Sequence, residues 1–159
     1  MTNTFLDQDT FKVVVDSAPL ISIDLVVRSA NGTVLLGKRT NRPAKGFWFV
    51  PGGRVLKGET LANAFSRLTL AELGIELSID QADYLGLYEH FYHDSALCES
   101  TSTHYVVNAF VITLNQDITE LPQEQHSDYR WLSQNELLSD KQVHEHSKWY
   151  FMNEKGYLA

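Results

Sequence analysis

The fold of this chain is decided by the stretch GGRVLKGETLANAFSRLTLAELGI, residues 52–75. The two glycines allow unusual backbone angles and a close approach to a ligand, and a helix N-terminus that follows such a turn suits a phosphate. Apolar residues then recur at helical spacing, and Gly74 is a natural C-cap. The stretch therefore predicts a glycine turn followed by an amphipathic helix over residues 59–73, although a Gly-Gly pair alone is typical of ordinary turns.

The predicted helix directs one carboxylate towards the glycine turn. Position 68 lies one turn before Glu72 on the same face, and Arg67 lies near Glu72 in angle. Mg²⁺ prefers a few carboxylates plus substrate phosphates, so Glu72 is a candidate metal ligand. The alternative is a surface glutamate, which residue type alone favours.

The segments on either side predict a mixed sheet. Residues 20–29 alternate apolar and more polar side chains, which indicates a strand with one buried face. Asn31-Gly32 predicts a hairpin turn to a partner strand over 33–39. Other patterns predict a strand over 47–53 that is broken by Pro51 and two glycines, strands over 83–92, 103–114 and 128–133, and helices over 8–17, 133–138 and 146–155. The predicted fold class is α/β (α+β), with a mixed β-sheet sandwiched between helices in a single domain spanning 1–159.

Composition restricts the compartment and the partners. A chain of 159 residues with 43% hydrophobic and 21% charged residues is typical of a globular protein. No apolar run approaches the roughly 20 residues that span a bilayer, and acids stand at the N-terminus where a signal peptide is basic. Cys98 is the single cysteine, which excludes an intrachain disulfide and favours the cytoplasm. We therefore expect a cytoplasmic protein with no membrane partner.

The charge distribution points to a small ligand. A net charge of −7 argues against nucleic acid as a partner. Between Asp24 and Glu59 there is no acidic residue, whereas this segment holds Lys38, Arg39, Arg42, Lys45, Arg54 and Lys57. A local basic segment in an acidic protein indicates a small anionic ligand, but charge alone is equally consistent with a solvated basic face.

The residues of this stretch resemble the Nudix hydrolase signature. The matching positions are Gly53, Glu59, Arg67, Glu72, Gly74 and Ile75, whereas Leu68 and Ala71 each stand where the signature has a glutamate. That departure, with the blocks LGKRTNRPAKGFWFVPGGRV, RLTLAELG, THYVV and EQHSDYRWL, resembles the divergent GDP-mannose mannosyl hydrolase family. The similarity runs from about residue 11 to about residue 151.

The resemblance implies an activity and a cofactor. It implies hydrolysis of GDP-mannose, with GDP-glucose as a second substrate, to GDP and free sugar by water attack at the anomeric carbon with inversion. It also implies one Mg²⁺, with Mn²⁺ as a substitute, bound by the Gly52 carbonyl, Glu72 and the Gln125 side chain. A homodimer and a role in supplying GDP-mannose for surface polysaccharide are implied in the same way.

Further residues take roles by the same resemblance. His126 matches the general base, and Asp24 matches a residue that acts near the sugar. A histidine base must be unprotonated to act, so activity is expected to rise as pH passes upward through its pKa. Arg39 and Arg54 match residues that neutralise the diphosphate, with Arg39 counted among the catalytic groups, and Tyr105 matches a hydroxyl contact to it.

Other positions carry two readings. Arg67 either orients Glu72 or assists the diphosphate, and Glu59 either pairs with Arg67 or interacts with the helix dipole. His90 and Tyr92 are substrate-pocket candidates, with Tyr92 a candidate to stack on guanine, although aromatic strand residues are usually core.

The missing glutamates fit attack on carbon better than attack on phosphorus. Attack on phosphorus brings a nucleophile towards an anionic centre, where several cations help. At an anomeric carbon the transition state is cation-like, and the base stands away from the metal. Two alternatives remain: a conventional pyrophosphohydrolase that releases GMP and sugar phosphate, and a non-catalytic nucleotide-sugar binding module. Leu68 and Ala71 count against the first, and the retained Glu72, Gln125 and His126 count against the second.

Overall fold

The computed structural model describes residues 5–95, 100–115, 118, 121–122, 126–153 and 156, with residues 126 and 127 described by their backbone alone. Its elements, in chain order, are α1 (Gln8–Ser17), β1 (Leu20–Arg28), β2 (Val34–Arg39), β3 (Trp48–Phe49), β4 (Gly52–Arg54), α2 (Leu61–Leu73), the 3₁₀ helix η1 (Ile79–Gln81), β5 (Asp83–Tyr92), β6 (Thr103–Thr113), β7 (His126–Leu132), α3 (Gln134–Ser139), α4 (Glu145–Lys148) and the 3₁₀ helix η2 (Trp149–Phe151). Most predicted strands and helices have a counterpart at nearly the predicted bounds, since turn and cap residues mark most of the ends. The predicted strand over 47–53 is instead divided into β3 and β4, and the predicted helix over 146–155 is the short α4 followed by η2.

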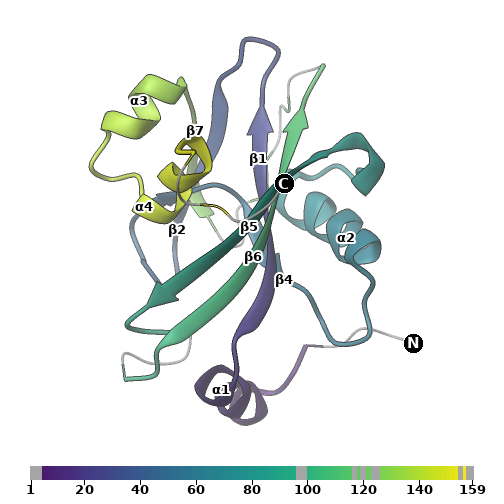
Figure 1. Cartoon of the computed structure of the whole chain (residues 1–159), viewed down its shortest axis with the longest axis vertical. Coiled ribbons are helices and arrows are strands. Elements are labelled where there is room, and N and C mark those ends of the chain that lie inside the picture. The colour runs from purple at the N-terminus through teal and green to yellow at the C-terminus, as the bar shows by residue number, and fades with distance from the viewer. Residues whose placement is uncertain are drawn as a thin grey trace.

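The strands described here form one seven-stranded mixed sheet with the order β3-β2-β1-β6-β5, in which β4 pairs with β1 and β7 pairs with β2. β1 and β6 are parallel along the whole of β1, and β5 and β6 are antiparallel. Figure 1 shows α2 on one side of the sheet and α3 and α4 on the other. The predicted mixed sheet between helices is therefore confirmed.

The prediction of a single buried face for β1 is wrong. Ile23, Leu25 and Val27 pack in a core cluster with α2, which we call the α2-side core. Val26 packs in a second cluster with residues of α3 and η2, which we call the C-terminal-side core. Both faces of a strand at the centre of a sheet are covered when helices lie on both sides. β1 therefore has buried residues on both faces, instead of the predicted alternation of buried and exposed residues.

The alternating direction of the side chains along β1 determines on which face of the sheet Asp24 lies. Because side chains point to opposite faces in turn, Asp24 shares the face of Val26 and Ser22, opposite Ile23 and Leu25. That face is covered by the C-terminal residues, and Tyr150 of η2 belongs to its core. Asp24 is therefore directed towards the C-terminal segment rather than towards α2.

The predicted helix over 59–73 and its C-cap are confirmed in α2. The Thr60 side chain accepts a hydrogen bond from the Asn63 backbone at 3.1 Å, and Gly74 takes a left-handed conformation with φ of 77°. Phe65 and Leu73 are completely buried against the sheet. Burying each such side chain contributes roughly 1.5–3 kcal/mol, so α2 is fixed firmly beside the strands that it covers.

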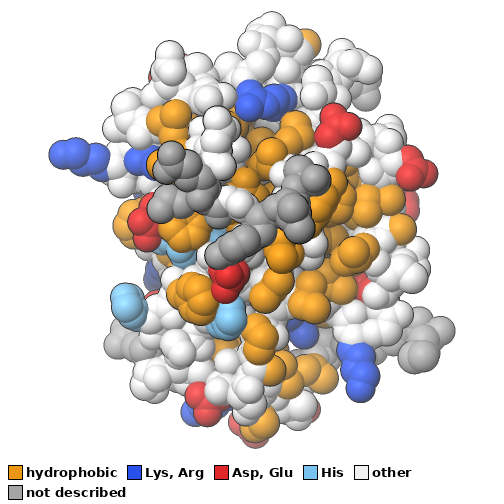
Figure 2. All heavy atoms as spheres, viewed as in Figure 1, with side chains coloured by type: hydrophobic (Ala, Val, Ile, Leu, Met, Phe, Trp, Pro, Cys, Tyr) orange, Lys and Arg blue, Asp and Glu red, His pale blue; other side chains and the backbone are white. Residues whose placement is uncertain are grey.

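The surface carries apolar side chains as well as charged ones. Figure 2 shows apolar side chains gathered over the middle of the face seen in Figure 1. Among the described residues, the most exposed large apolar side chains are Phe5, Val13 and Phe91, with 74%, 65% and 59% of their surface accessible. Within the described part of the chain, every helix is too short or too polar to cross a bilayer.

Candidate active site

A cavity of about 200 Å³ opens on the face of the sheet that carries Asp24. Seven residues that the sequence predicts to bind substrate or metal or to act in catalysis line this cavity: Asp24, Arg39, Gly52, Arg54, His90, Tyr92 and Tyr105. They come from β1, β2, β4, β5 and β6, and the sheet order brings these strands together. Two basic residues of the acid-free segment, Arg39 and Arg54, therefore line a cavity, which gives it the positive charge that an anionic ligand requires.

The glycine pair lies in a strand, and the expected glycine turn is wrong. Gly52 and Gly53 belong to β4 and pair antiparallel with Asp24 and Ile23 of β1. The left-handed glycine before α2 is instead Gly58, with φ of 86°. Gly52 is needed for its lack of a side chain, because a Cβ there would lie 2.3 Å from Asp24 Oδ1. The pair therefore permits close packing of β4 on β1.

The two positions that depart from the Nudix signature have opposite surroundings. Leu68 is 3% exposed in the α2-side core, and a Cβ on Gly53 would lie 2.5 Å from its Cδ2. Ala71 is exposed to solvent. The space that a carboxylate at position 68 would occupy is thus filled by an apolar side chain packed on the glycine strand.

Glu72 is a buried carboxylate rather than a surface one. It is 3% exposed, so the alternative of an ordinary surface glutamate is wrong. Its negative charge contributes to raising the pKa of Asp24, which lines the cavity. Charged residues are rarely buried unless they have a partner, and α2 keeps this carboxylate on the face that meets the sheet.

The pKa of Asp24 lies near neutral pH. Burial raises its pKa to about 7; the hydrogen bond from Tyr150 and the charge of Arg39 oppose this rise, and the charge of Glu72 adds to it. The Tyr150 hydroxyl donates this bond to Asp24 Oδ2. A carboxyl group in a cleft with a strongly shifted pKa is typical of a functional site.

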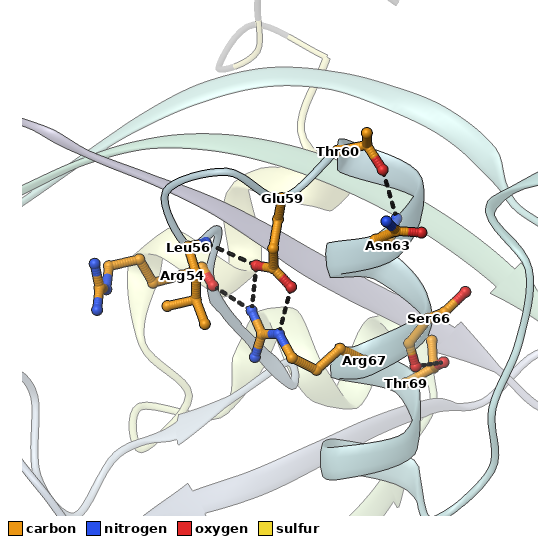
Figure 3. Close-up of polar contacts among 8 residues, drawn as sticks. All are labelled: Arg54, Leu56, Glu59, Thr60, Asn63, Ser66, Arg67 and Thr69. Atoms are coloured by element: carbon orange, nitrogen blue, oxygen red, sulfur yellow. Dashed lines mark hydrogen bonds and ion pairs between the residues drawn. The ribbon is translucent and has the colours of Figure 1, made fainter. Parts of the chain in front are cut away.

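Arg67 forms an ion pair with Glu59, as Figure 3 shows, and the predicted pairing of these two residues is confirmed. Its Nε donates to Glu59 Oε2 at 2.7 Å, and the same guanidinium donates to the Arg54 carbonyl at 2.8 Å. Glu59 also accepts a hydrogen bond from the Leu56 backbone at 2.7 Å. These contacts fix the loop between β4 and α2, while a direct role of Arg67 at the diphosphate or on Glu72 stays a prediction.

The Arg54 side chain leaves this network. Figure 3 shows its guanidinium directed away from Arg67, and it lies 4.7 Å from the centre of the Phe11 ring. Arg67 binds only the main-chain carbonyl of Arg54, and Arg54 also lines the cavity. The guanidinium contacts the Phe11 ring of α1.

The aromatic wall of the cavity is kept neutral. His90 is 3% exposed and stacks on His146, with ring centres 4.3 Å apart. Burial, followed by the neighbouring His146 and His144, lowers the pKa of His90 to about 2. Burial also raises the pKa of Tyr92 and Tyr105, so both hydroxyls stay protonated and can donate hydrogen bonds to an anion.

His126 is located by its backbone. It begins β7 and is the Cα partner of Arg39 on β2, so its main chain lies one strand away from a cavity residue. The His126 side chain and the whole of Gln125 lie outside the described residues. Their roles as base and metal ligand stay predictions.

Sequence reasoning missed Tyr150 and His146. Both come from the C-terminal helices and contact cavity residues on β1 and β5. Nothing in their spacing indicates this, since the contacts join segments far apart in the chain. The only sequence signal is the density of histidine and aromatic residues in HEHSKWYF, residues 144–151.

Comparison with known proteins assigns the family. The NUDIX domain family matches residues 18–152, which is most of the chain, so this protein belongs to the Nudix family. A relative with 45% identity over 124 residues, covering 78% of this chain and 77% of its own, is the low-salt glycan biosynthesis protein Agl8 of Haloferax volcanii.

Solved structures agree on the fold. The MutT protein from Methanosarcina mazei Go1 aligns with a TM-score of 0.68 and 22% identity, over 85% of this chain and 92% of its own. The NUDIX domain of Shewanella oneidensis NrtR, complexed with ADP ribose, aligns with a TM-score of 0.65 and 17% identity, over 92% and 96%. The predicted Nudix fold is therefore confirmed.

Proposed function

We propose that this protein hydrolyses GDP-mannose, with GDP-glucose as a second substrate, to GDP and free sugar by attack of water on the anomeric carbon with inversion. The observation that carries the proposal is the cavity itself. It combines one acid, Asp24, with two arginines, Arg39 and Arg54. The signature position that would add a metal-binding carboxylate is occupied by the buried Leu68.

The Haloferax relative supports a sugar-containing substrate. Its name connects it with glycan biosynthesis, and nucleotide sugars are the activated donors of such pathways. The acidic overall charge and the local pair of arginines suit a compact anionic ligand rather than a polyanion. A nucleoside diphosphate linked to a hexose meets both requirements.

The reaction breaks the bond between the anomeric carbon and the diphosphate oxygen. Arg39 and Arg54 neutralise the charge that grows on the departing GDP, for which a guanidinium is well shaped, and the protonated Tyr105 hydroxyl donates to it. The sugar becomes cation-like in the transition state, and the ionised Asp24 stabilises that charge. His126 accepts the proton of the attacking water, whose oxygen forms the new bond to carbon.

Mg²⁺ fits the donors that the structure offers. Glu72 supplies one buried carboxylate, and its charge contributes to raising the pKa of the cavity residue Asp24. A hard cation that keeps water and substrate phosphates among its ligands suits such a donor set. Glu72, the Gly52 carbonyl and Gln125 would hold the ion, which supplies further neutralisation of the leaving group.

Product analysis tests the proposal. The purified protein is incubated with GDP-mannose and Mg²⁺, nucleotides are separated by ion-exchange chromatography, and the first sugar anomer is followed by proton NMR. We expect GDP and β-mannose. GMP with mannose 1-phosphate would establish a conventional pyrophosphohydrolase, an initial α anomer would contradict inversion, and tight binding without turnover would indicate a binding module.

We also propose a homodimer in the cytoplasm. Exposed apolar side chains near the N-terminus, among them Phe5, Val13 and Ile21, support a partner surface there, and Phe5 also lines the cavity. A second copy seated on these residues would lie close to the site. Light scattering across a hundredfold concentration range measures the mass, and a constant monomer mass would contradict the dimer.

A further inference from the structure

The C-terminal segment contributes one hydroxyl to the wall of the cavity. Tyr150 on η2 donates to Asp24 Oδ2, and the same oxygen lies 3.4 Å from His90 Nε2. Burial, with the nearby Asp24, raises the pKa of Tyr150 well above its usual value, so the hydroxyl keeps its proton and remains a donor. One side chain thus connects two cavity residues from different strands.

The other carboxylate oxygen of Asp24 lies beside Gly52. A Cβ on Gly52 would come within 2.3 Å of Asp24 Oδ1, so this oxygen occupies the space that the glycine leaves open. The hydrogen bond from Tyr150 holds Oδ2. The orientation of Asp24 in the cavity therefore depends on Tyr150.

Tyr150 is itself well anchored. It is 6% exposed, and its ring meets that of Tyr88 edge-on at 4.7 Å. The preceding residues are tied to the strands beside the cavity: the His144 backbone donates to the Trp48 carbonyl at 3.0 Å, and Ser147 Oγ accepts from the Val50 backbone at 3.0 Å. A hydroxyl on so rigid a support can fix the position of its partner.

We propose that Tyr150 is a positioning residue for the reaction, whose hydroxyl holds the Asp24 carboxylate in the orientation that faces the sugar. The proposal rests on the proposed function, in which Asp24 acts near the anomeric carbon. Loss of the hydroxyl alone would leave the tyrosine ring packed but the carboxylate free to turn. The resulting misplacement lowers kcat, while diphosphate binding by Arg39 and Arg54 continues.

The test compares two variants that each remove one phenolic hydroxyl. Tyr150→Phe removes the donor to Asp24, and Tyr88→Phe removes the hydroxyl of the ring packed against it. We expect Tyr150→Phe to lower kcat on GDP-mannose about 10- to 100-fold, as a displacement of about 1 Å does, with KM and the Kd for GDP within about twofold. Tyr88→Phe should keep kcat within about twofold.

A double-mutant cycle separates positioning from general damage. In an Asp24→Asn background, Tyr150→Phe should cause little further loss, because the group that it positions has already been removed. Wild-type kcat in Tyr150→Phe, or losses that multiply in the double variant, would overturn the proposal.

A crystal structure of Tyr150→Phe gives a readout that does not depend on the reaction. We expect the Asp24 carboxylate to have turned away from its place over Gly52, and an unmoved carboxylate would overturn the positioning role. If the wild-type protein releases GMP or fails to turn over GDP-mannose, the proposed function fails, while the position of Asp24 in this variant still decides whether Tyr150 orients it.

Discussion

Arg39 and His126 are Cα partners across the antiparallel pair of β2 and β7. Arg39 lines the cavity, so the register of this pair brings the main chain at the start of β7 beside a cavity residue. The pairing uses backbone atoms only. We therefore expect a substitution at position 126 to leave the strand in place.

His126→Leu is expected to reduce kcat by about 100- to 10,000-fold, which is the contribution of a positioned general base. His93→Leu, a change at an exposed histidine on the loop after β5, serves as the control and should keep its activity. Steady-state kinetics on GDP-mannose measures both. Wild-type turnover in His126→Leu would remove this residue from the mechanism.

Glu72→Gln is expected to weaken the binding of Mg²⁺. An amide replaces a buried carboxylate of similar shape, so the fold is retained while one charged ligand is lost. Titration of Mn²⁺ followed by electron paramagnetic resonance measures the affinity directly, and the Mg²⁺ concentration for half-maximal activity should rise at least about tenfold. Unchanged metal affinity would show that Glu72 is not a ligand.

Substitution of glutamate for Leu68 and for Ala71, the two residues that depart from the signature, should have different effects on stability. Leu68→Glu places an unpaired charge in the α2-side core against Gly53 and should lower the free energy of unfolding by roughly 3–5 kcal/mol. Ala71→Glu adds the same group at an exposed position and should change it by about 0.5 kcal/mol or less. Urea denaturation in EDTA measures both, and equal values for the two variants would contradict the described packing of α2.

The neighbouring glycines provide a second matched pair. Gly52→Ala would bring a Cβ within 2.5 Å of the Ile23 carbonyl as well as against Asp24, whereas Gly53→Ala meets mainly the end of the Leu68 side chain. Backbone yields less readily than a side-chain methyl, so Gly52→Ala should be destabilised by about 1–3 kcal/mol and lose activity, and Gly53→Ala should be milder on both counts. The reverse order in thermal melts and kinetics would contradict the described β1–β4 contact.

His146 predicts how stability depends on pH. Burial, with the nearby His144, lowers its pKa from 6.5 to about 3 in the folded state. Between these values the unfolded chain binds the proton and the folded chain does not, so stability falls as pH falls through this window. Thermal melts at pH 7 and pH 5 should therefore differ less for His146→Leu than for the wild type. Asp24, with a raised pKa, acts in the opposite direction in both proteins and cancels in this comparison.

The sequence predicts what local chemistry determines. The C-terminal end of α2 follows from Gly74, and the β1–β2 hairpin follows from Asn31-Gly32; Gly32 adopts φ of 82° in the structure. The family follows from the spacing of Gly53, Glu59 and Glu72. These features depend on residues close together in the chain, so their patterns can be read directly.

What the sequence does not predict depends on contacts between distant segments. The burial of both faces of β1 follows from the α2-side core on one side of the sheet and the C-terminal-side core on the other, and the strand conformation of Gly52 follows from its pairing with Asp24. The hydrogen bond of Tyr150 to Asp24 joins the C-terminal helix to the first strand. No local sequence pattern predicts these contacts, because each of them joins segments that come together only in the assembled sheet.

The fate of the water oxygen tests the central claim most directly. GDP-mannose is hydrolysed by the wild-type protein in ¹⁸O-labelled water with Mg²⁺, and both products are analysed by mass spectrometry. Attack at the anomeric carbon predicts the label in free mannose and none in GDP. Label on a phosphate group of the nucleotide or of a sugar phosphate would contradict the account.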